Sequence, residues 1–175
     1  PGAVALTGMA CLRSGIGLAT LAVPESIQQT VAGYCPAYTT QRLVEDDGGV
    51  VHWGNLFDLE TQEDQFDVWA AGPGLGKPEY TADLVGRMYQ SWVMPLVLDA
   101  DGLNALAIYE HHRGSVMNNP FGFRVLTPHP GEFARLVNED RLAPLATGGD
   151  GQRVEAAAAL AQRDKTDQTV VLLKG

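Results

Sequence analysis

The sequence predicts an α/β fold in three layers, in which a mostly parallel sheet carries helices on both of its faces. Short apolar runs rich in β-forming residues alternate along the chain with longer segments of helical periodicity, as in repeated β–α–β units. Of the 175 residues, 45% are hydrophobic and 19% are charged, which is enough apolar material for the core of one domain. Glycine, proline and acidic residues gather where the predicted strands end, and ligands bind at that edge of a parallel sheet.

The first part of the chain is expected to form two helices and two strands. Residues 4–13 have apolar side chains at helical spacing and are followed by a Ser-Gly stop. The apolar run 18–23 predicts a buried strand, and Pro24 then opens a helix, because proline suits the first helical turn. Residues 39–44 are a candidate strand, whereas residues 45–64 are acidic and polar and show no clear pattern.

The middle of the chain repeats the alternation of strand and helix. The apolar run 66–71 predicts a strand that ends at a glycine-rich turn, and residues 79–92 fit an amphipathic helix. Residues 96–98 predict a short strand that ends at an aspartate, and a helix is expected over 102–109. The run 124–127 predicts the next strand.

The last part of the chain completes the pattern. A proline opens a short helix over 130–137. Residues 151–163 include four successive alanines and predict a longer helix, because alanine is the best helix former. The β-branched and leucine residues of 169–173 predict a final strand.

Charge and cysteine content exclude several classes of protein. Twelve Lys and Arg residues against 21 Asp and Glu residues give a net charge of −9, which argues against nucleic acid and anionic membranes as partners, since both require a basic face. Phosphate-bearing ligands stay compatible, because backbone N–H groups can hold them. Cys11 and Cys35 are too few for a disulfide scaffold, so we expect free thiols in a reducing, cytoplasmic compartment. No apolar run approaches the roughly 18–20 residues of a membrane helix.

The first strand-end motif is a glycine-rich loop over residues 72–77. Its glycines allow the backbone to approach a ligand closely and to point N–H groups at an anion. It is not a Walker loop, because Ala71 and Pro78 stand where that motif requires glycine and Ser or Thr, and its glycine spacing does not match the dinucleotide fingerprint. A ligand-binding loop and an ordinary tight turn both remain open. The glycines are Gly72, Gly74 and Gly76.

The second motif combines two carboxylates and an amide directly after the strand at 96–98. Asp99, Asp101 and Asn104 are side chains that can bind Mg²⁺ or a substrate hydroxyl. The alternative is that Asp99 or Asp101 caps the following helix.

The third motif is a histidine held between two prolines after the strand at 124–127. Because Pro128 and Pro130 restrict the backbone on both sides, His129 is expected to point at a ligand from a rigid loop. Glu132 lies in the first turn of the next helix, where it can be directed at a metal-bound water or, alternatively, cap the helix.

The fourth motif, Lys174-Gly175, follows the strand at 169–173. The lysine can neutralise a phosphate, and the glycine allows the backbone to wrap around it. The alternative is a solvated lysine.

Together, these four motifs resemble one family, the ATP- or ADP-dependent NAD(P)H-hydrate dehydratases of the ribokinase-like superfamily. Gly2-Ala3 and the helix that runs on to residues 13–18 are also similar to the family, so the resemblance covers nearly the whole chain in the right order. It implies repair of the nicotinamide cofactors NADHX and NADPHX, from which water is removed at the expense of ATP or ADP. Phosphorylation of the hydroxyl makes it a good leaving group, and elimination then restores the nicotinamide ring.

The resemblance also implies roles for individual residues. The substrate contacts are expected at Ala3, Gly72, Gly74, Gly76, His129 and Glu132. Lys174 and Gly175 are expected at the nucleotide phosphates. Asp99, Asp101, Asn104 and Glu132 are expected to organise Mg²⁺ and phosphate, with no residue assigned as a direct metal ligand. Homo-oligomers are usual in the family.

The sequence departs from the family pattern at both ends. The family has a glycine-rich strand before the position of Gly2-Ala3, and after Lys174-Gly175 it has a Gly-Thr/Ser-Gly-Asp loop whose aspartate is the expected catalytic base. We therefore expect residues 1–175 to form a single ribokinase-like domain that is incomplete at both ends and inactive alone. The alternatives are a small-molecule kinase of the same superfamily that acts on a vitamin-precursor alcohol and a non-catalytic nucleotide-binding module. The motif at 127–132 favours the dehydratase.

Overall fold

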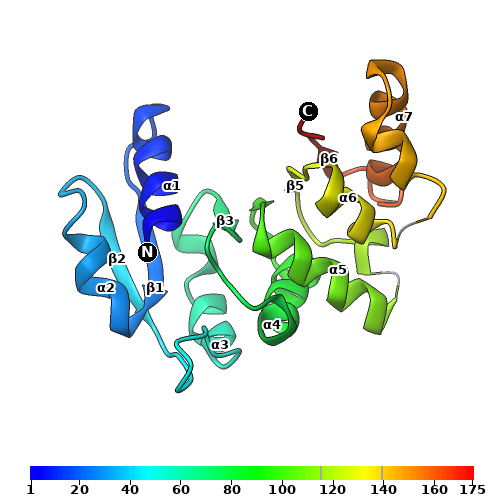
Figure 1. Ribbon diagram of the computed structural model, residues 1–175. Helices are drawn as coiled ribbons and strands as arrows, with labels where there is room; N and C mark the ends of the chain where they lie inside the picture. The colour runs from blue at the N-terminus through cyan, green and yellow to red at the C-terminus, as the bar shows by residue number, and fades with distance from the viewer. Residues whose placement is uncertain (115, 139) are drawn as a thin grey trace.

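The computed structural model describes residues 1–114, 116–138 and 140–175, which form two parallel sheets with flanking helices (Figure 1). The strands are β1 (Thr20–Pro24), β2 (Thr39–Leu43), β3 (Trp69–Ala71), β4 (Leu96–Leu98), β5 (Arg124–Leu126) and β6 (Thr169–Val171). The α-helices are α1 (Gly2–Arg13), α2 (Glu25–Ala32), α3 (Asn55–Glu60), α4 (Pro78–Ser91), α5 (Asp101–Arg113), α6 (Pro130–Leu136) and α7 (Asp150–Ala161). Single 3₁₀ segments are η1 (Glu63–Gln65), η2 (Val116–Asn118) and η3 (Ala143–Thr147).

Parallel pairing organises both sheets. β1 pairs with β2, and β3, β4, β5 and β6 pair in chain order, so that Leu98 lies between Ala71 and Leu126. The predicted α/β class, with parallel strands and flanking helices, is confirmed. The strands form two sheets instead of the expected single one. The stretch 44–68 between them folds into an antiparallel bridge at Glu45 and Val51, α3 and η1.

Most of the predicted helices and strands are present with shifted ends. β4 spans the predicted residues. β3 is shorter than the apolar run 66–71, because its pairing begins only at Trp69, whose N–H donates to the carbonyl of Pro95 at 2.9 Å. α5 continues past its predicted end at residue 109 to Arg113, and its last turn is basic, which suits the helix dipole. α3 was not predicted, because it lies in the acidic stretch that has no hydrophobic period.

The core of the four-stranded sheet lies on the face that the crossover helices cover. Because such crossovers are almost always right-handed, strands laid in chain order carry these helices on one face. Leu96, Leu98 and Leu126 point to that face and are fully buried, and they pack in one cluster with residues of α4 and α5. Val170 and Leu172 point to the opposite face and are 58% and 62% exposed. Across the described ranges, no helix has the length and apolar character needed to cross a membrane.

A buried arginine joins the amino ends of two strands to the end of a helix. Arg124, the first residue of β5, has no exposed surface, and all five of its N–H donors reach backbone carbonyls. Burial lowers the pKa of Arg124 from its ordinary value, but a guanidinium retains its charge. The acceptors are the carbonyls of Met88, Tyr89 and Trp92 at the end of α4, Met94 before β4 and Phe123.

A buried aspartate holds the turn that leads into β6. Asp164 is 6% exposed, and its carboxylate accepts hydrogen bonds from the N–H and hydroxyl of Thr166 at 2.7 and 2.6 Å. The N–H of Gln168 and the hydroxyl of Thr169 donate to its second oxygen at 2.9 and 2.8 Å. Burial alone would raise the pKa of Asp164, but these hydrogen bonds outweigh burial and hold the pKa below its ordinary value.

We predict that Arg124→Met lowers the free energy of unfolding by about 3 kcal/mol, because several buried carbonyls would lose their donors while the apolar stem is kept. The exposed Arg141 provides a matched control, and Arg141→Met should leave the stability nearly unchanged. Urea denaturation of the two variants and the wild type measures both effects. Equal midpoints for the two variants would contradict the role assigned to Arg124.

We predict that Asp164 stabilises the folded protein at neutral pH and that this stabilisation is lost in acid. Because the pKa of Asp164 is lowered in the folded state, its contribution is complete above the unfolded pKa of about 3.9 and is lost as the pH falls through the folded value. The wild type should therefore be more stable than Asp164→Asn at pH 7, and the difference should shrink below about pH 4. Thermal unfolding across this range checks it, and a difference that grows in acid would refute it.

Candidate functional site

The carboxyl ends of β3, β4, β5 and β6 bring the four sequence motifs to one edge of the sheet (Figure 1). Each motif begins directly after its strand or within a few residues of it. The backbone N–H of Lys174 donates to the carbonyl of Pro128 at 2.8 Å, so the chain beyond β6 continues beside the loop after β5. The parallel topology therefore assembles the predicted site residues from distant parts of the chain.

Two glycines allow the loops after β3 and β4 to pack backbone against backbone. Gly72 has a φ of +127°, and a Cβ on it would overlap the carbonyl oxygen of Asp99. A Cβ on Gly102 would lie only 2.9 Å from the Cα of Gly72. Further along, the N–H of Gly76 donates to Oδ2 of Asp101 at 2.9 Å. These contacts make the two loops a single rigid wall of the site.

The first helix reaches the same glycine-rich loop. Gly74 has a φ of +75°, and a Cβ on it would lie 3.1 Å from the Cβ of Ala3 in the first turn of α1. The structure therefore brings together Ala3 and Gly74, two of the residues predicted to contact substrate.

Lys174 lies at the centre of a charged cluster beside the loops that follow β3 and β4. Its Nζ lies 2.5 Å from Oδ1 of Asp99 and 3.9 Å from Oε2 of Glu132. Burial alone would raise the pKa of Asp99, but hydrogen bonds from Lys174, the N–H of Ala100 and Thr127 outweigh burial and hold the pKa below its ordinary value. Asp99 is therefore a carboxylate, and its Oδ1 accepts a hydrogen bond from Nζ of Lys174.

His129 and Glu132 hold each other at the start of α6. Nδ1 of His129 accepts hydrogen bonds from the N–H groups of Gly131 and Glu132 at 3.0 and 3.4 Å, while Oε2 of Glu132 accepts from the N–H of His129 at 2.9 Å. Since Nδ1 accepts, the neutral imidazole carries its proton on Nε2, which lies 3.2 Å from Oε1 of Glu132. Glu132 is 5% exposed, whereas His129 presents half of its side chain to solvent. Glu132 therefore caps α6, as one of the two alternatives predicted. The same hydrogen bonds fix His129 at the surface of the site.

The remaining acidic and amide residues of the second motif are held by other contacts. Oδ1 of Asn104 accepts from Nη1 of Arg135 at 2.9 Å. Asp101 accepts from the glycine-rich loop, and neither Asp99 nor Asp101 caps α5 with its side chain. The described contacts therefore bring Asp99 and Glu132 to the lysine, and tie Asp101 and Asn104 to neighbouring loops and helices.

One charged residue at this edge was missed by the sequence analysis. Arg153 in α7 donates from Nη2 to the carbonyl of Leu173 at 3.3 Å, and its guanidinium lies against Gly175. No local signal marks it, because it lies inside an alanine-rich helix and reaches the site only through the fold.

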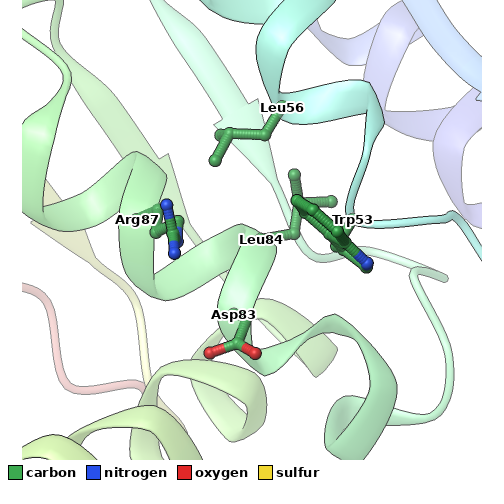
Figure 2. Close-up of a pocket in the computed structure, with 5 residues that line it drawn as sticks. All are labelled: Trp53, Leu56, Asp83, Leu84 and Arg87. Carbon is green, nitrogen blue, oxygen red and sulfur yellow. The ribbon is translucent and has the colours of Figure 1, made fainter.

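A pocket elsewhere on the surface does not involve the predicted residues. Figure 2 shows it on α4 and near α3, with Leu56 and Leu84 beside Trp53 and with Asp83 and Arg87 at its charged side. None of these residues comes from the four motifs. Within the described part of the chain, no group of three or more His, Cys, Asp and Glu side chains is arranged to hold a metal ion by itself.

We predict that Gly72→Ala destabilises the protein by about 2 kcal/mol or more, because the new methyl group meets backbone in a conformation that L-residues avoid. Gly151→Ala is the matched control: it lies in α7 with open space around it, so alanine should be neutral or stabilise by about 0.5–1 kcal/mol. Denaturation midpoints of both variants test the prediction, and a harmless Gly72→Ala would show that the two loops are not in contact.

Comparisons with known proteins identify the relatives of this chain. A family model described as NAD(P)H-hydrate dehydratase matches residues 1–175. The bifunctional NAD(P)H-hydrate repair enzyme of Moorella thermoacetica is 38% identical over 174 residues, which are 99% of this chain and 31% of that protein. The ADP-dependent (S)-NAD(P)H-hydrate dehydratase of Xanthomonas campestris is 34% identical over 175 residues, which are all of this chain and 54% of that protein. The chain thus spans about a third to a half of the length of these relatives.

Solved structures share the fold of this chain. The ADP/ATP-dependent NAD(P)H-hydrate dehydratase of Bacillus subtilis, co-crystallised with ATP and Mg²⁺ and soaked with coenzyme A, has a TM-score of 0.67 and 28% identity, and the match covers all of this chain and 55% of that one. A ribokinase-like superfamily protein of Enterococcus faecalis has the same TM-score at 19% identity, over 99% of this chain and 53% of that one, which supports the fold alone. Because the family model matches residues 1–175, the chain belongs to the NAD(P)H-hydrate dehydratase family.

Proposed function

We propose that this protein repairs hydrated nicotinamide cofactors, removing water from NADHX and NADPHX at the expense of ADP or ATP. The observation that carries the proposal is the meeting of four family motifs at one sheet edge, where Lys174 contacts both Asp99 and Glu132. The names of the relatives and the ATP and Mg²⁺ in the crystals of the Bacillus subtilis protein support it.

The chemistry requires two steps, since hydroxide is a poor leaving group. The substrate hydroxyl oxygen first attacks the terminal phosphorus of the nucleotide, the bond from that phosphorus to the bridging oxygen breaks, and the hydroxyl proton passes to a base. The carbon–oxygen bond of the resulting phosphate ester then breaks, inorganic phosphate leaves, and the adjacent carbon loses a proton to restore the double bond. Positioning and charge stabilisation therefore supply most of the catalysis.

The residues of this chain have distinct tasks in that scheme. The N–H of Gly76 is already bonded to Asp101, but the backbone around Gly74 can hold the substrate beside Ala3, because glycine leaves no side chain between backbone and ligand. His129 is held rigidly by Glu132, and about half of its side chain is exposed, which suits a packing contact that orients the substrate. Lys174 and Gly175 lie where the nucleotide phosphates are proposed to bind.

The carboxylates fit a magnesium ion that is bound mainly through phosphate. Mg²⁺ in nucleotide sites usually takes one or two protein carboxylates and completes its shell with phosphate oxygens and water. Asp99 and Glu132 are two such carboxylates, close to each other through Lys174. We propose that they hold Mg²⁺ directly or through water, and that the ion, when bound, neutralises charge on the transferred phosphoryl group.

We predict that the full-length protein, given ADP or ATP with Mg²⁺ and hydrated NADH, regenerates absorbance at the reduced-nicotinamide band and releases one phosphate per cofactor repaired. Stopped assays of nucleotide, phosphate and NADH measure the stoichiometry. Lys174→Met should lower the turnover at least about tenfold, because a charge-assisted contact to phosphate is lost.

Small alcohols resembling vitamin precursors serve as competing substrates in the same assay. Nucleotide-dependent phosphorylation of such an alcohol without repair of hydrated NADH would overturn the proposal in favour of a kinase. Nucleotide binding without turnover of either substrate would favour a non-catalytic module.

A further inference from the structure

We propose that Arg153 of α7 is a phosphate-binding residue of the nucleotide site. This proposal rests on the proposed function and adds a residue that none of the four sequence motifs contains. The guanidinium lies at the carboxyl end of β6. Its Nη2 donates to the carbonyl of Leu173 at 3.3 Å, and a Cβ on Gly175 would collide with both Nη1 and Nη2. Arg153 is thus in contact with the Lys174-Gly175 segment, although it is some twenty residues away in the chain.

Among the described residues, the one hydrogen bond of the Arg153 side chain leaves most of its donors unused. A guanidinium has five N–H donors. In Arg124 all five reach backbone carbonyls, as expected for a structural arginine, whereas Arg153 makes one long bond and its buried Nε has no partner among the described residues. Because buried donors are nearly always paired, an incompletely satisfied guanidinium beside a proposed phosphate site is informative.

The charge balance at this edge points to the same residue. Lys174 already lies beside Asp99 and Glu132, so one ammonium and two carboxylates leave this cluster with a formal charge of −1. Arg153 has no carboxylate within the 4.0 Å that defines an ion pair, within the part of the chain that the structure describes. In contrast to Lys174, Arg153 is therefore a cation beside β6 with which no carboxylate of the described residues pairs.

The chemistry of arginine fits a nucleotide phosphate better than that of lysine in this setting. The planar fork of a guanidinium can donate two parallel hydrogen bonds to a phosphate, and its charge persists at any physiological pH. A polyanionic nucleotide that approaches the carboxylates of Asp99 and Glu132 requires a cation of this kind, together with Mg²⁺. We infer that Arg153 contacts the phosphate together with Lys174, which also holds the two carboxylates.

The test compares nucleotide binding by Arg153→Met, Arg153→Lys and the wild type of the full-length protein, by calorimetry with ADP and ATP in the presence of Mg²⁺. Arg153→Met keeps the apolar stem and should raise the Kd for both nucleotides about tenfold or more. Arg153→Lys keeps the charge but loses the fork, so its Kd should be intermediate. Adenosine, which has no phosphate, should bind all three proteins equally.

Arg163→Met is the matched control, since Arg163 follows the same helix and pairs with Asp140 at 2.9 Å. Its Kd for ADP should equal that of the wild type, and melting temperatures without ligand should show that all variants are folded. Wild-type affinity of Arg153→Met for ADP and ATP, or an equal loss for adenosine, would overturn the assignment and leave the proposed function intact. A wild type that binds neither nucleotide would overturn both.

Discussion

The four-stranded sheet depends on one buried guanidinium. Each of its strands has only three residues, so the hydrogen bonds of the ladder alone give a short and weak register. Arg124 adds four bonds that join the start of β5 to the end of α4 and to the segment before β4. These bonds fix the register of β5 against β4 at their amino ends. The register at their carboxyl ends is then fixed as well, because a slip by one residue would turn every side chain to the other face. The position of Asp99 beside the loop after β5 is therefore supported by a contact at the far end of the sheet.

The protein and its proposed ligand are both negatively charged, so binding requires local groups that offset the repulsion between them. A net charge of −9 repels a nucleotide, but this repulsion is largely screened beyond a Debye length of roughly 8 Å at physiological salt. On the proposed function, the substrate then meets the glycine-rich loop, and the nucleotide meets Lys174 and the guanidinium of Arg153. Binding is thus governed by a few oriented donors and not by the total charge.

Sequence alone predicted the parts of the molecule whose signal is local. The strand at 96–98 and the helices at 79–92 and 130–137 have a clear period or a turn residue at their ends, and the family motifs located Asp99, His129 and Lys174. Two kinds of feature were out of reach. α3 lies in an acidic stretch without a hydrophobic period, so packing and not propensity determines it. Arg124 and Arg153 act on residues 20 or more positions away, and a side chain's partners across such a distance exist only once the sheet has formed.

The backbone between β4 and α5 shows how the site is prepared before a ligand arrives. Ala100 has a φ of 51° and a ψ of −123°, a conformation that costs a non-glycine residue on the order of 1–3 kcal/mol. The strain is offset by Oδ1 of Asp99, which accepts the N–H of Ala100 at 2.8 Å and is held by Lys174 at 2.5 Å. On the other side, the carbonyl of Asp99 leaves no room for a side chain at Gly72. The aspartate is therefore locked by its own backbone, by the lysine and by the neighbouring loop. A carboxylate fixed in this way loses little conformational freedom when a ligand binds, which is the physical advantage of placing strain at this position.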